Sequence, residues 1–497
     1  MNIKQNHIKK IYKRRIRFPV LQMISGMLIA ILLAGCAVVG PDYLPPKISA
    51  PGQWQADLKQ GLSQGSMDFR MMAGWWTTLN DPTLTRLIQR AVTGNLDLKE
   101  ARSRVREARA RRGISAAERF PTIDATGSAS SSRSSEDIGS GDRRELYAAG
   151  FDANWELDVF GGVRRSVEAA RADLEASRED YRDIMVSLLA EVALNYVEVR
   201  TFQTRLDVAE KNLETQTETY ELTVFRFKAG LSSALDMEQA KYNLENTRSK
   251  IPTLRISLEG AKNRLAVLLG IHPGALHEDL SVKKPIPVPS LEIAVGVPAQ
   301  VLRRRPDIRR AERELAAQTA RVGVATAELY PKFSLMGSIG LEALSFGDLF
   351  STNNRTDSIG PSVSWNIFDA GAIRKNIEVQ NALQEQALLK YESAVLNALE
   401  DVENALVAYA QDQYRRQSLS QATQAAERAM DLALKQYASG IIDFQDTLEA
   451  QRSLLSFQDQ LAESDGAVTS NLISLYKALG GGWTPLMSET AESNGKN

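Results

Sequence analysis

Cysteine and histidine, which often act as nucleophiles, general bases and transition-metal ligands, are scarce in this 497-residue chain. It contains one cysteine, Cys36, and three histidines, His7, His272 and His277. A single cysteine excludes a disulfide framework and a zinc site built from cysteines. The segment 61–65 (Gly-Leu-Ser-Gln-Gly) has the spacing of a serine-hydrolase elbow, but its polar flanks lack the strand and helix that such an elbow needs. We therefore expect neither an enzyme nor a protein with a resident cofactor or metal.

The cysteine stands at the end of an N-terminal targeting segment. Residues 1–17 carry seven basic side chains and no acidic one, and a largely apolar run follows over 18–33. This order is typical of a secretory signal that is removed. The Leu-Ala-Gly-Cys sequence at 33–36 resembles the lipobox of bacterial lipoproteins, which implies cleavage before Cys36 and acylation of its thiol. Ala37 at the next position resembles outer-membrane sorting. A signal anchor with a chance cysteine is the alternative.

The charge of the chain argues against a nucleic-acid partner. Lys and Arg number 60 and Asp and Glu number 61, and the chain from residue 36 onward would hold 53 basic against 61 acidic residues. A nucleic-acid-binding chain normally shows a clustered basic excess. A charged fraction of 24% also excludes a polytopic helical membrane protein.

The chain is an internal duplication, because identical residues recur at a constant offset of 210 positions without a gap. The offset pairs Asp97 with Asp307, Gly113 with Gly323, Pro121 with Pro331, Trp155 with Trp365, Gly230 with Gly440, and Asp236 with Asp446. We divide the chain into a signal peptide (1–35), a lipidated extended segment (36–83), repeat 1 (84–270), a Pro-rich linker (271–293), repeat 2 (294–480) and a C-terminal tail (481–497).

Each repeat contains two segments in which apolar and polar residues alternate, as they do along strands with unlike faces. We expect strands near 122–132, 146–158, 332–342 and 358–368. The expected apolar face carries Phe151, Trp155, Leu335 and Trp365, and the polar face carries Asp152, Asn154, Ser334 and Asn366. Such strands fit a half-buried sheet or a transmembrane barrel wall, and the lack of other β-type sequence favours the barrel. Because four strands cannot close a barrel, several chains must do so.

Each repeat continues into helices of unusual length. No proline interrupts the segment 163–228, and a step of seven residues links the apolar side chains Met185, Val192, Val199, Leu206, Leu213, Tyr220 and Phe227. Such a heptad ladder indicates a coiled-coil seam. At 1.5 Å per residue this helix would be about 100 Å long, far longer than an ordinary domain. Gly230 and Gly440 are expected to end the long helices at hairpin tips.

Three sequence motifs carry a resemblance to a known family. They are Gly-Pro-Asp-Tyr at 40–43, Trp-Trp-Thr-Thr-Leu-Asn-Asp-Pro-Thr-Leu at 75–84, and Val-Leu-Arg-Arg-Arg-Pro-Asp-Ile at 301–308. With Cys36, they make the chain similar to the lipoprotein branch of the TolC-like outer-membrane efflux factors. The third motif more often serves the fold, as a helix start, than transport.

The resemblance implies a mainly α fold with a small β part. Three copies would form a homotrimer, with a 12-stranded β-barrel in the outer membrane and an α-barrel extending into the periplasm. It implies two partners, a periplasmic adaptor and an inner-membrane pump of the resistance-nodulation-division type. The channel would conduct drugs or other small molecules passively, without catalytic chemistry of its own.

The resemblance also assigns roles to the hairpin tips. It implies that Gly230-Leu231 and Gly440-Ile441 dock the adaptor, although these turns could simply be helix caps. It further implies a periplasmic gate, with a link between Tyr437 and Asp236 that keeps the tunnel shut. Three-fold symmetry would gather nearby carboxylates into a ring that favours cations, and the candidates are Asp443, Asp446 and Glu449. The chain has Ile442 where related channels can carry an arginine that braces the gate.

Two other functions remain open at the level of sequence. One is the exit duct of a type I protein-secretion system, against which Cys36 argues weakly. The other is a lipid-anchored periplasmic coiled-coil scaffold, which would not need the alternating strands. The sequence does not reveal which compounds are exported.

Overall fold

The computed structural model describes residues 38–47, 50–65, 69–287 and 293–483. The expected signal peptide, Cys36 and most of the expected C-terminal tail lie outside these ranges. The described chain forms two compact units. Unit 1 comprises residues up to 46, 106–176 and 311–391, and unit 2 comprises 47–105, 177–310 and 392 onward.

The order of elements repeats along the chain. After β1 (Leu62–Ser63), α2 (Phe69–Ala73) and η1 (Trp75–Leu79), the first repeat contains α3 (Pro82–Gly94), α4 (Leu96–Ala117), β2 (Thr122–Arg133), β3 (Arg143–Leu157), α5 (Gly162–Lys228) and α6 (Ala234–Leu268). After β4 (Ile293–Ala294), the second contains α7 (Pro298–Arg304), α8 (Pro306–Ala327), β5 (Lys332–Ala343), η2 (Phe346–Asp348), η3 (Thr352–Asn354), β6 (Arg355–Ser364), α9 (Ala372–Ala438) and α10 (Phe444–Ala478).

Three pairs of corresponding helices have equal lengths, whereas α3 has 13 residues and its counterpart α7 has 7. α4 and α8 have 22 residues each, α5 and α9 have 67, and α6 and α10 have 35. The mainly helical fold, the long helices and the duplication predicted from the sequence are therefore confirmed. None of the helices within the described ranges combines the length and the apolar composition that a membrane-spanning helix requires.

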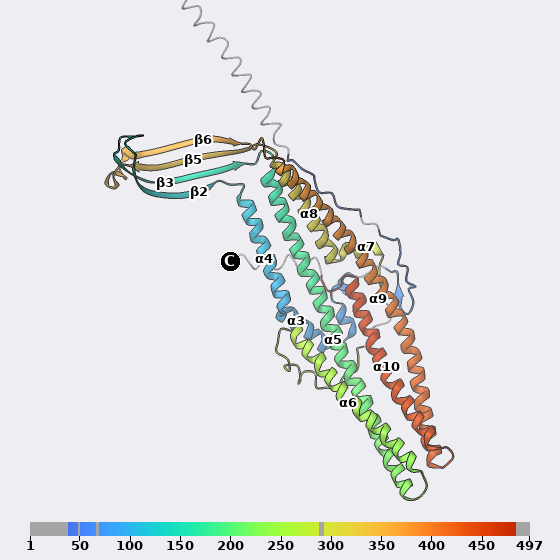
Figure 1. The fold of residues 1–497 in the computed structure, drawn as a ribbon. Helices are drawn as coiled ribbons and strands as arrows, with labels where there is room; N and C mark the ends of the chain where they lie inside the picture. The colour runs from blue at the N-terminus through green and yellow to red at the C-terminus, as the bar shows by residue number, and fades with distance from the viewer. Residues whose placement is uncertain (1–37, 48–49, 66–68, 288–292, 484–497) are drawn as a thin grey trace, which may run out of the picture. The chain divides into compact units, whose positions relative to one another are not determined.

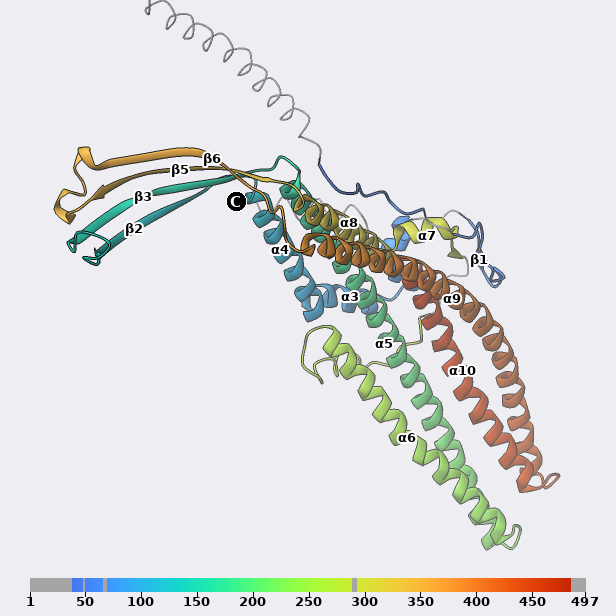
Figure 2. The same cartoon turned by 45° about the horizontal axis from the view of Figure 1, so that its top comes forward.

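The four long strands belong to unit 1 and form one antiparallel sheet in the order β2, β3, β5, β6. Figures 1 and 2 show these strands side by side, with the loops between paired strands at one end of the sheet. The central pair, β3 and β5, joins the two repeats, because Trp155 of repeat 1 lies opposite Leu335 of repeat 2. The sheet is thus built equally from both halves of the duplication.

Two strand boundaries differ from those expected. β3 begins at Arg143 rather than near residue 146, because β2 extends to Arg133 and these arginines pair in register. The expected strand at 358–368 is instead β6, which ends at Ser364. Ser364 pairs with Lys332, the first residue of β5, so the residues after it have no partner on that strand. The prediction that Trp365 and Asn366 lie within a strand is therefore wrong.

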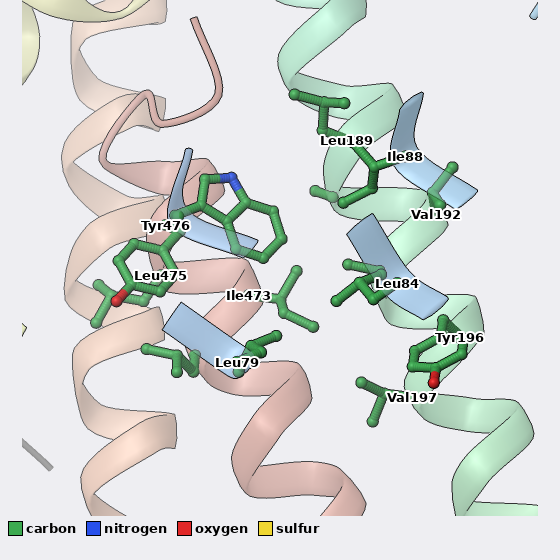
Figure 3. Packing of buried hydrophobic residues seen from close by; sticks show 14 of the residues in the cluster. Leu79, Leu84, Ile88, Leu189, Val192, Tyr196, Val197, Ile473, Leu475 and Tyr476 are labelled. Carbon is green, nitrogen blue, oxygen red and sulfur yellow. The ribbon is translucent and has the colours of Figure 1, made fainter. Parts of the chain in front are cut away.

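Unit 2 holds the main hydrophobic core, where the N-terminal motif at 75–84 packs between long helices. Figure 3 shows Leu84 and Ile88 of α3 with Leu189 and Val192 of α5, and Ile473 and Tyr476 of α10 nearby. The ring of Trp75 stacks on that of Tyr476 with a centroid distance of 5.4 Å. Asp81 caps α3, because its side chain accepts hydrogen bonds from the backbone N–H groups of Thr83 and Leu84. The motif therefore has a structural role.

The heptad ladder of α5 holds over the middle of the helix and fails at its end. Val192, Val199 and Leu206 are buried, as a packed seam requires. Phe227, the last member, is 39% exposed in the single chain. The coiled-coil seam thus ends before the hairpin tip, where Arg226 contacts Tyr437 instead.

Candidate functional site

The sheet has one apolar and one polar face. One row of paired residues joins Ala125, Phe151 and Ile339 and ends at Asp357 on β6, which forms an ion pair with Arg355 at 3.9 Å; the next row joins Ile123, Ala153, Gly337 and Ile359. Phe151, Ile339, Ile123 and Ile359 are all exposed in the single chain. A sheet face with this much exposed apolar area needs an apolar environment to cover it.

The opposite face carries polar rows. Asp124, Asp152, Ser338 and Ser358 form one continuous row across all four strands. Thr126 donates a hydrogen bond to the Asp152 carboxylate at 2.9 Å, and the Ser338 and Ser358 hydroxyls lie 2.7 Å apart. Asn154 and Ser334 fall on this face by the same alternation. The predicted division between apolar Phe151, Trp155 and Leu335 and the polar residues therefore agrees with the register.

The two repeats anchor the start of the sheet in the same way. The indole N–H of Trp155 donates to the carbonyl oxygen of Arg119 at 3.0 Å, and that of Trp365 donates to the carbonyl of Leu329 at 3.1 Å. Both bonds obey the offset of 210 residues. Trp365 thus keeps the role of its counterpart, even though it lies beyond β6.

The N-terminal segment is tied to unit 1 close to this end of the sheet. The backbone N–H of Val39 donates to the carbonyl of Phe160, three residues after β3 ends, at 3.1 Å. The buried Arg165 side chain holds the segment by an ion pair with Asp42 at 2.7 Å. Gly40 (φ +87°) passes so close to Gly323 that a Cβ on Gly40 would lie 2.4 Å from the Cα atom of Gly323. The segment that follows Cys36 in the sequence is therefore fixed at the base of β3.

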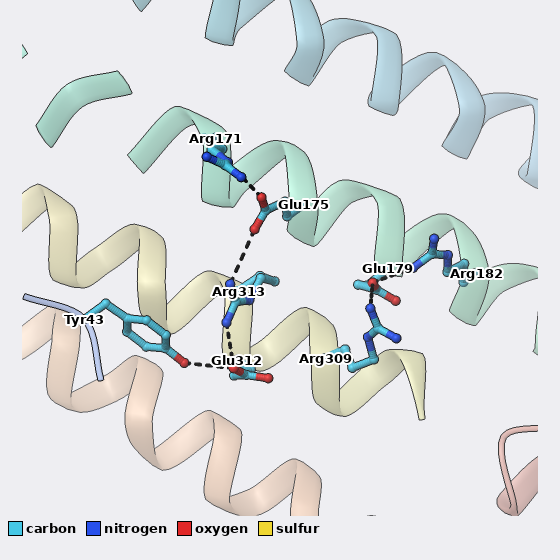
Figure 4. A network of polar contacts seen from close by, with 8 residues as sticks. All are labelled: Tyr43, Arg171, Glu175, Glu179, Arg182, Arg309, Glu312 and Arg313. Carbon is cyan, nitrogen blue, oxygen red and sulfur yellow. Dashed lines mark hydrogen bonds and ion pairs between the residues drawn. The ribbon is translucent and has the colours of Figure 1, made fainter. Parts of the chain in front are cut away.

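A polar network fixes the next residue of the N-terminal motif. Figure 4 shows the Tyr43 hydroxyl donating to Glu312 at 3.1 Å, and Arg313 joining Glu312 at 2.6 Å and Glu175 at 3.4 Å. The guanidinium of Arg313 also lies 5.3 Å from the centre of the Tyr43 ring. Burial and the Glu312 carboxylate raise the pKa of Tyr43, so the phenol remains a hydrogen-bond donor.

A second polar network in Figure 4 lies within unit 2. Both Arg182 and Arg309 contact the buried Glu179 carboxylate, at 2.6 Å and 2.8 Å. Two guanidinium groups on one buried carboxylate offset its desolvation. This network joins α5 to α8 and serves the fold.

The arginine-rich motif at 301–308 also serves the fold, as the sequence suggested. Arg305 is buried and pairs with Asp307 and Asp401, each at 2.8 Å. Its Nη1 donates to the carbonyl of Ala478 at the end of α10 at 3.0 Å. Arg305 therefore joins the start of α8 to α9 and to the end of α10 within unit 2.

The hairpin tips are alike in backbone. Gly230 (φ +74°) and Gly440 (φ +73°) adopt the left-handed conformation that ends a helix. The next residues complete equivalent caps, because the N–H groups of Leu231 and Ile441 donate to carbonyls five residues earlier at 2.8 Å and 2.9 Å. Leu231 is 68% exposed and Ile441 is 72% exposed. The four residues predicted to dock an adaptor thus form two similar caps with exposed apolar tips.

Tyr437, near the second tip, lies against the first hairpin. Its side chain is 5% exposed and its ring lies 5.4 Å from that of Phe444. The guanidinium of Arg226 on α5 lies 4.6 Å from the centre of the Tyr437 ring, and its Nη1 donates to the Tyr437 carbonyl at 3.2 Å. Within the described chain the Tyr437 hydroxyl is buried without a hydrogen-bond partner. Arg226, rather than an aspartate, therefore contacts Tyr437.

Asp236 is engaged elsewhere. Its carboxylate accepts from the N–H of Ser233 at 2.9 Å, and the Ser233 hydroxyl accepts from the N–H of Asp236 at 3.1 Å. This capping box begins α6. The described contacts of one chain thus contain no Tyr437–Asp236 link. Ile442 packs partly buried against the cluster of Tyr437, Phe444 and Leu448.

The three remaining carboxylates lie at the start of α10. Asp443 is the N-cap residue but makes no side-chain cap hydrogen bond, and Asp446 and Glu449 follow on the helix. All three are exposed, and among the described contacts none has a side-chain hydrogen bond or ion pair. They form a free acidic group, favoured by the positive end of the helix dipole.

Sequence reasoning missed Arg226. The repeat offset gives no signal for it, because its counterpart at position 436 is Gln. A basic residue in the last turn of a long helix is ordinarily assigned to the helix dipole. Its place beside Tyr437 depends on how the two hairpins pack within unit 2.

Duplicated long helices and a sheet with unlike faces define an outer-membrane channel protein of the long-helix class. A family model described as outer membrane efflux protein matches residues 87–271 and again 297–481, which repeats the offset of 210 residues. The chain belongs to this outer membrane efflux protein family, whose members are channels rather than enzymes.

Individual relatives match over nearly the whole chain. Nodulation protein T of Rhizobium leguminosarum bv. trifolii is 33% identical over 463 residues, covering 92% of this chain and 97% of the relative. Cation efflux system protein CusC of Escherichia coli O6:H1 is 32% identical, with coverages of 92% and 97%. The solved structure of the outer-membrane channel OprN has a TM-score of 0.85 at 38% identity, covering 90% of this chain and 100% of that one. The predicted efflux function in the outer membrane is thereby confirmed.

Proposed function

We propose that three copies of the chain form the outer-membrane channel of a tripartite efflux pump, in which strands from all copies close one β-barrel. The observation that carries this proposal is the sheet with two free edges, since β2 and β6 each pair on one side only. Four strands cannot close on themselves, and exposed edges pair readily with another chain. Its apolar face would meet lipid and its polar face a water-filled lumen.

We propose two partners for this channel. The channel works with a periplasmic adaptor, which docks at the tips Gly230-Leu231 and Gly440-Ile441, and with an inner-membrane pump of the resistance-nodulation-division type. Relatives named as cation, antibiotic and solvent efflux proteins support small solutes as cargo rather than secreted proteins. Drug and metal susceptibility of cells that co-express the chain with candidate pump and adaptor pairs identifies the cargo.

A lipid on Cys36 holds the mature N-terminus at the inner leaflet of the outer membrane. The bond between Val39 and Phe160 supports this placement, because it fixes a residue three positions after Cys36 beside the end of β3. Several acyl chains at about 0.8 kcal/mol per buried methylene anchor a chain firmly. The chain is thus proposed as a lipoprotein of its family.

The gate at the hairpin tips is held closed within each chain by Arg226 and Tyr437. Opening would separate the two hairpins and expose the Tyr437 ring together with its neighbour Phe444. In the closed state, the free carboxylates Asp443, Asp446 and Glu449 would lie near those of the other copies around the three-fold axis, where such a ring attracts cations and its like charges strain the closed gate.

Two adjacent substitutions on β3 test the barrel. Ala153 lies on the apolar face and Asn154 on the polar face. An arginine facing lipid at mid-depth costs about 2–4 kcal/mol, and one facing water costs much less. We expect Ala153→Arg to lose trimers and conductance in planar bilayers, and Asn154→Arg to keep trimers with altered ion selectivity. Equal effects of both, or a monomer in native mass measurements of the unmodified protein, contradict the proposal.

A further inference from the structure

Two arginines oppose each other at the loop end of the β2–β3 hairpin. Arg133 pairs in register with Arg143, two rows beyond the apolar row of Ala129 and Tyr147. Since side chains alternate along a strand, both arginines project from the same face as Tyr147, whereas Arg144 projects from the polar face. All three arginines are exposed.

No carboxylate neutralises this pair within the described chain. The Nε of Arg133 donates to the Gly141 carbonyl and the Nε of Arg143 donates to the Ser131 hydroxyl, both at 2.8 Å. The next acidic residue on this face, Glu145, instead accepts from the Tyr147 hydroxyl at 3.2 Å. Like charges directly opposite on a sheet repel each other. Within the described chain the terminal nitrogens of both guanidinium groups make no hydrogen bond or ion pair, so these donors remain for an anion.

The position of Arg133 and Arg143 along the strands, relative to the apolar band, indicates which anion they would meet. The ring of Tyr147 packs edge-on against Phe346 with a centroid distance of 5.7 Å, and Trp155 lies at the other end of β3. The eight steps from Tyr147 to Trp155 span about 27 Å along the strand, which corresponds to about 21 Å along the membrane normal at a strand tilt of about 40°. Outer-membrane barrels have an apolar band about 25 Å tall between two aromatic girdles. Arg133 and Arg143 thus lie just outside this band, at the depth of the outer-leaflet headgroups.

We propose that Arg133 and Arg143 together bind a phosphate group of a phosphorylated glycolipid of the lipid A class in the outer leaflet. The inference rests on the proposed function, because it requires the apolar face to meet lipid. Guanidinium groups bind phosphate oxygens through paired N–H donors, and one phosphate between the two arginines removes their mutual repulsion. The lipid docks against the outer wall of the hairpin and orders its end.

Three single variants with the same change of charge test this site. The purified full-length protein and its Arg133→Gln, Arg143→Gln and Arg144→Gln forms are titrated in detergent with diphosphoryl lipid A, and binding is measured by native mass spectrometry. We expect each of the first two variants to bind about tenfold more weakly, as for loss of one charge-assisted contact, and Arg144→Gln to change affinity less than twofold. Lipid A without its phosphates should bind to none of them.

Conductance of the same preparations separates this inference from the channel proposal. If the unmodified protein forms no pores, the channel proposal fails. If all forms conduct equally but Arg143→Gln binds lipid A as tightly as Arg144→Gln, the lipid site alone is wrong. Displacement of lipid A by millimolar inorganic phosphate also overturns it, because the site would then be one for the free ion. Arg143→Lys keeps the charge without the paired donors, and it should bind with intermediate affinity even where Arg143→Gln does not assemble.

Discussion

Arg226→Gln should open the proposed gate without unfolding the hairpins. In the described chain the Arg226 guanidinium lies 4.6 Å from the Tyr437 ring centre and donates to the Tyr437 carbonyl at 3.2 Å. A cation over a partly desolvated ring contributes about 1–2 kcal/mol, and a charged hydrogen bond about 1.5–3 kcal/mol. Because Gln retains an amide donor, we expect a net loss of about 2 kcal/mol per chain. That loss shifts the equilibrium between closed and open states roughly 30-fold per chain.

Single-channel recording in planar bilayers measures this shift as a higher open probability or a larger mean conductance. Lys228→Gln is the matched control, because Lys228 is exposed near the same tip and the change removes the same charge. Tyr437→Phe keeps the ring beneath Arg226 and removes only a hydroxyl that has no partner in the described chain. It should therefore conduct like the unmodified channel. A channel opened by Tyr437→Phe as strongly as by Arg226→Gln refutes the reasoning, since the hydroxyl would then hold the gate through another chain.

Three further predictions concern the anchor, the acidic tip and a half-buried carboxyl. Cys36→Ala should abolish labelling by radioactive palmitate while some trimers still insert, and a fully labelled variant would remove the lipid assignment. Asp446→Asn should weaken block of the channel by multivalent cations, whereas Asp236→Asn should not, because the capping box already engages Asp236. Burial and Asp307 raise the pKa of Asp183, so its charged form destabilises the fold above that pKa and the penalty disappears as pH falls. Asp183→Asn should thus raise the melting temperature at pH 7 but not at strongly acidic pH, and an equal gain at both would contradict the burial argument.

Much of the fold could be predicted from the sequence because the duplication and the residue periods are properties of the chain itself. The period of two along β3 indicates which residues share a face, and Phe151 and Asp152 indeed project from opposite faces of the sheet. The ends of the strands were less predictable, because each depends on where the neighbouring, hydrogen-bonded strand begins or ends. β6 stops at Ser364, which lies opposite Lys332, the first residue of β5.

The contacts of the tip could not be predicted, because they depend on packing between segments about 200 residues apart. Tyr437 was identified from the sequence, but its observed neighbour is Arg226 rather than Asp236. Within the described chain Asp236 does not contact Tyr437, because its carboxylate forms a capping box with Ser233, three residues earlier. That box was readable from the sequence in principle, because a serine followed three residues later by an acid often begins a helix.

The hairpin tips of the two repeats share a backbone conformation but differ in their side-chain contacts. One difference lies at the N-cap residue of the helix that follows each tip. Ser233 caps α6 and engages Asp236, whereas the equivalent Asp443 caps α10 without a side-chain bond and leaves Asp446 free. The first hairpin instead supplies Arg226, which has a glutamine as its counterpart in repeat 2. One hairpin of each chain thus provides the cation that contacts Tyr437, and the other provides the carboxylates that we propose to lie around the three-fold axis. Because these roles are separate, closure and cation attraction can be altered independently in the same channel.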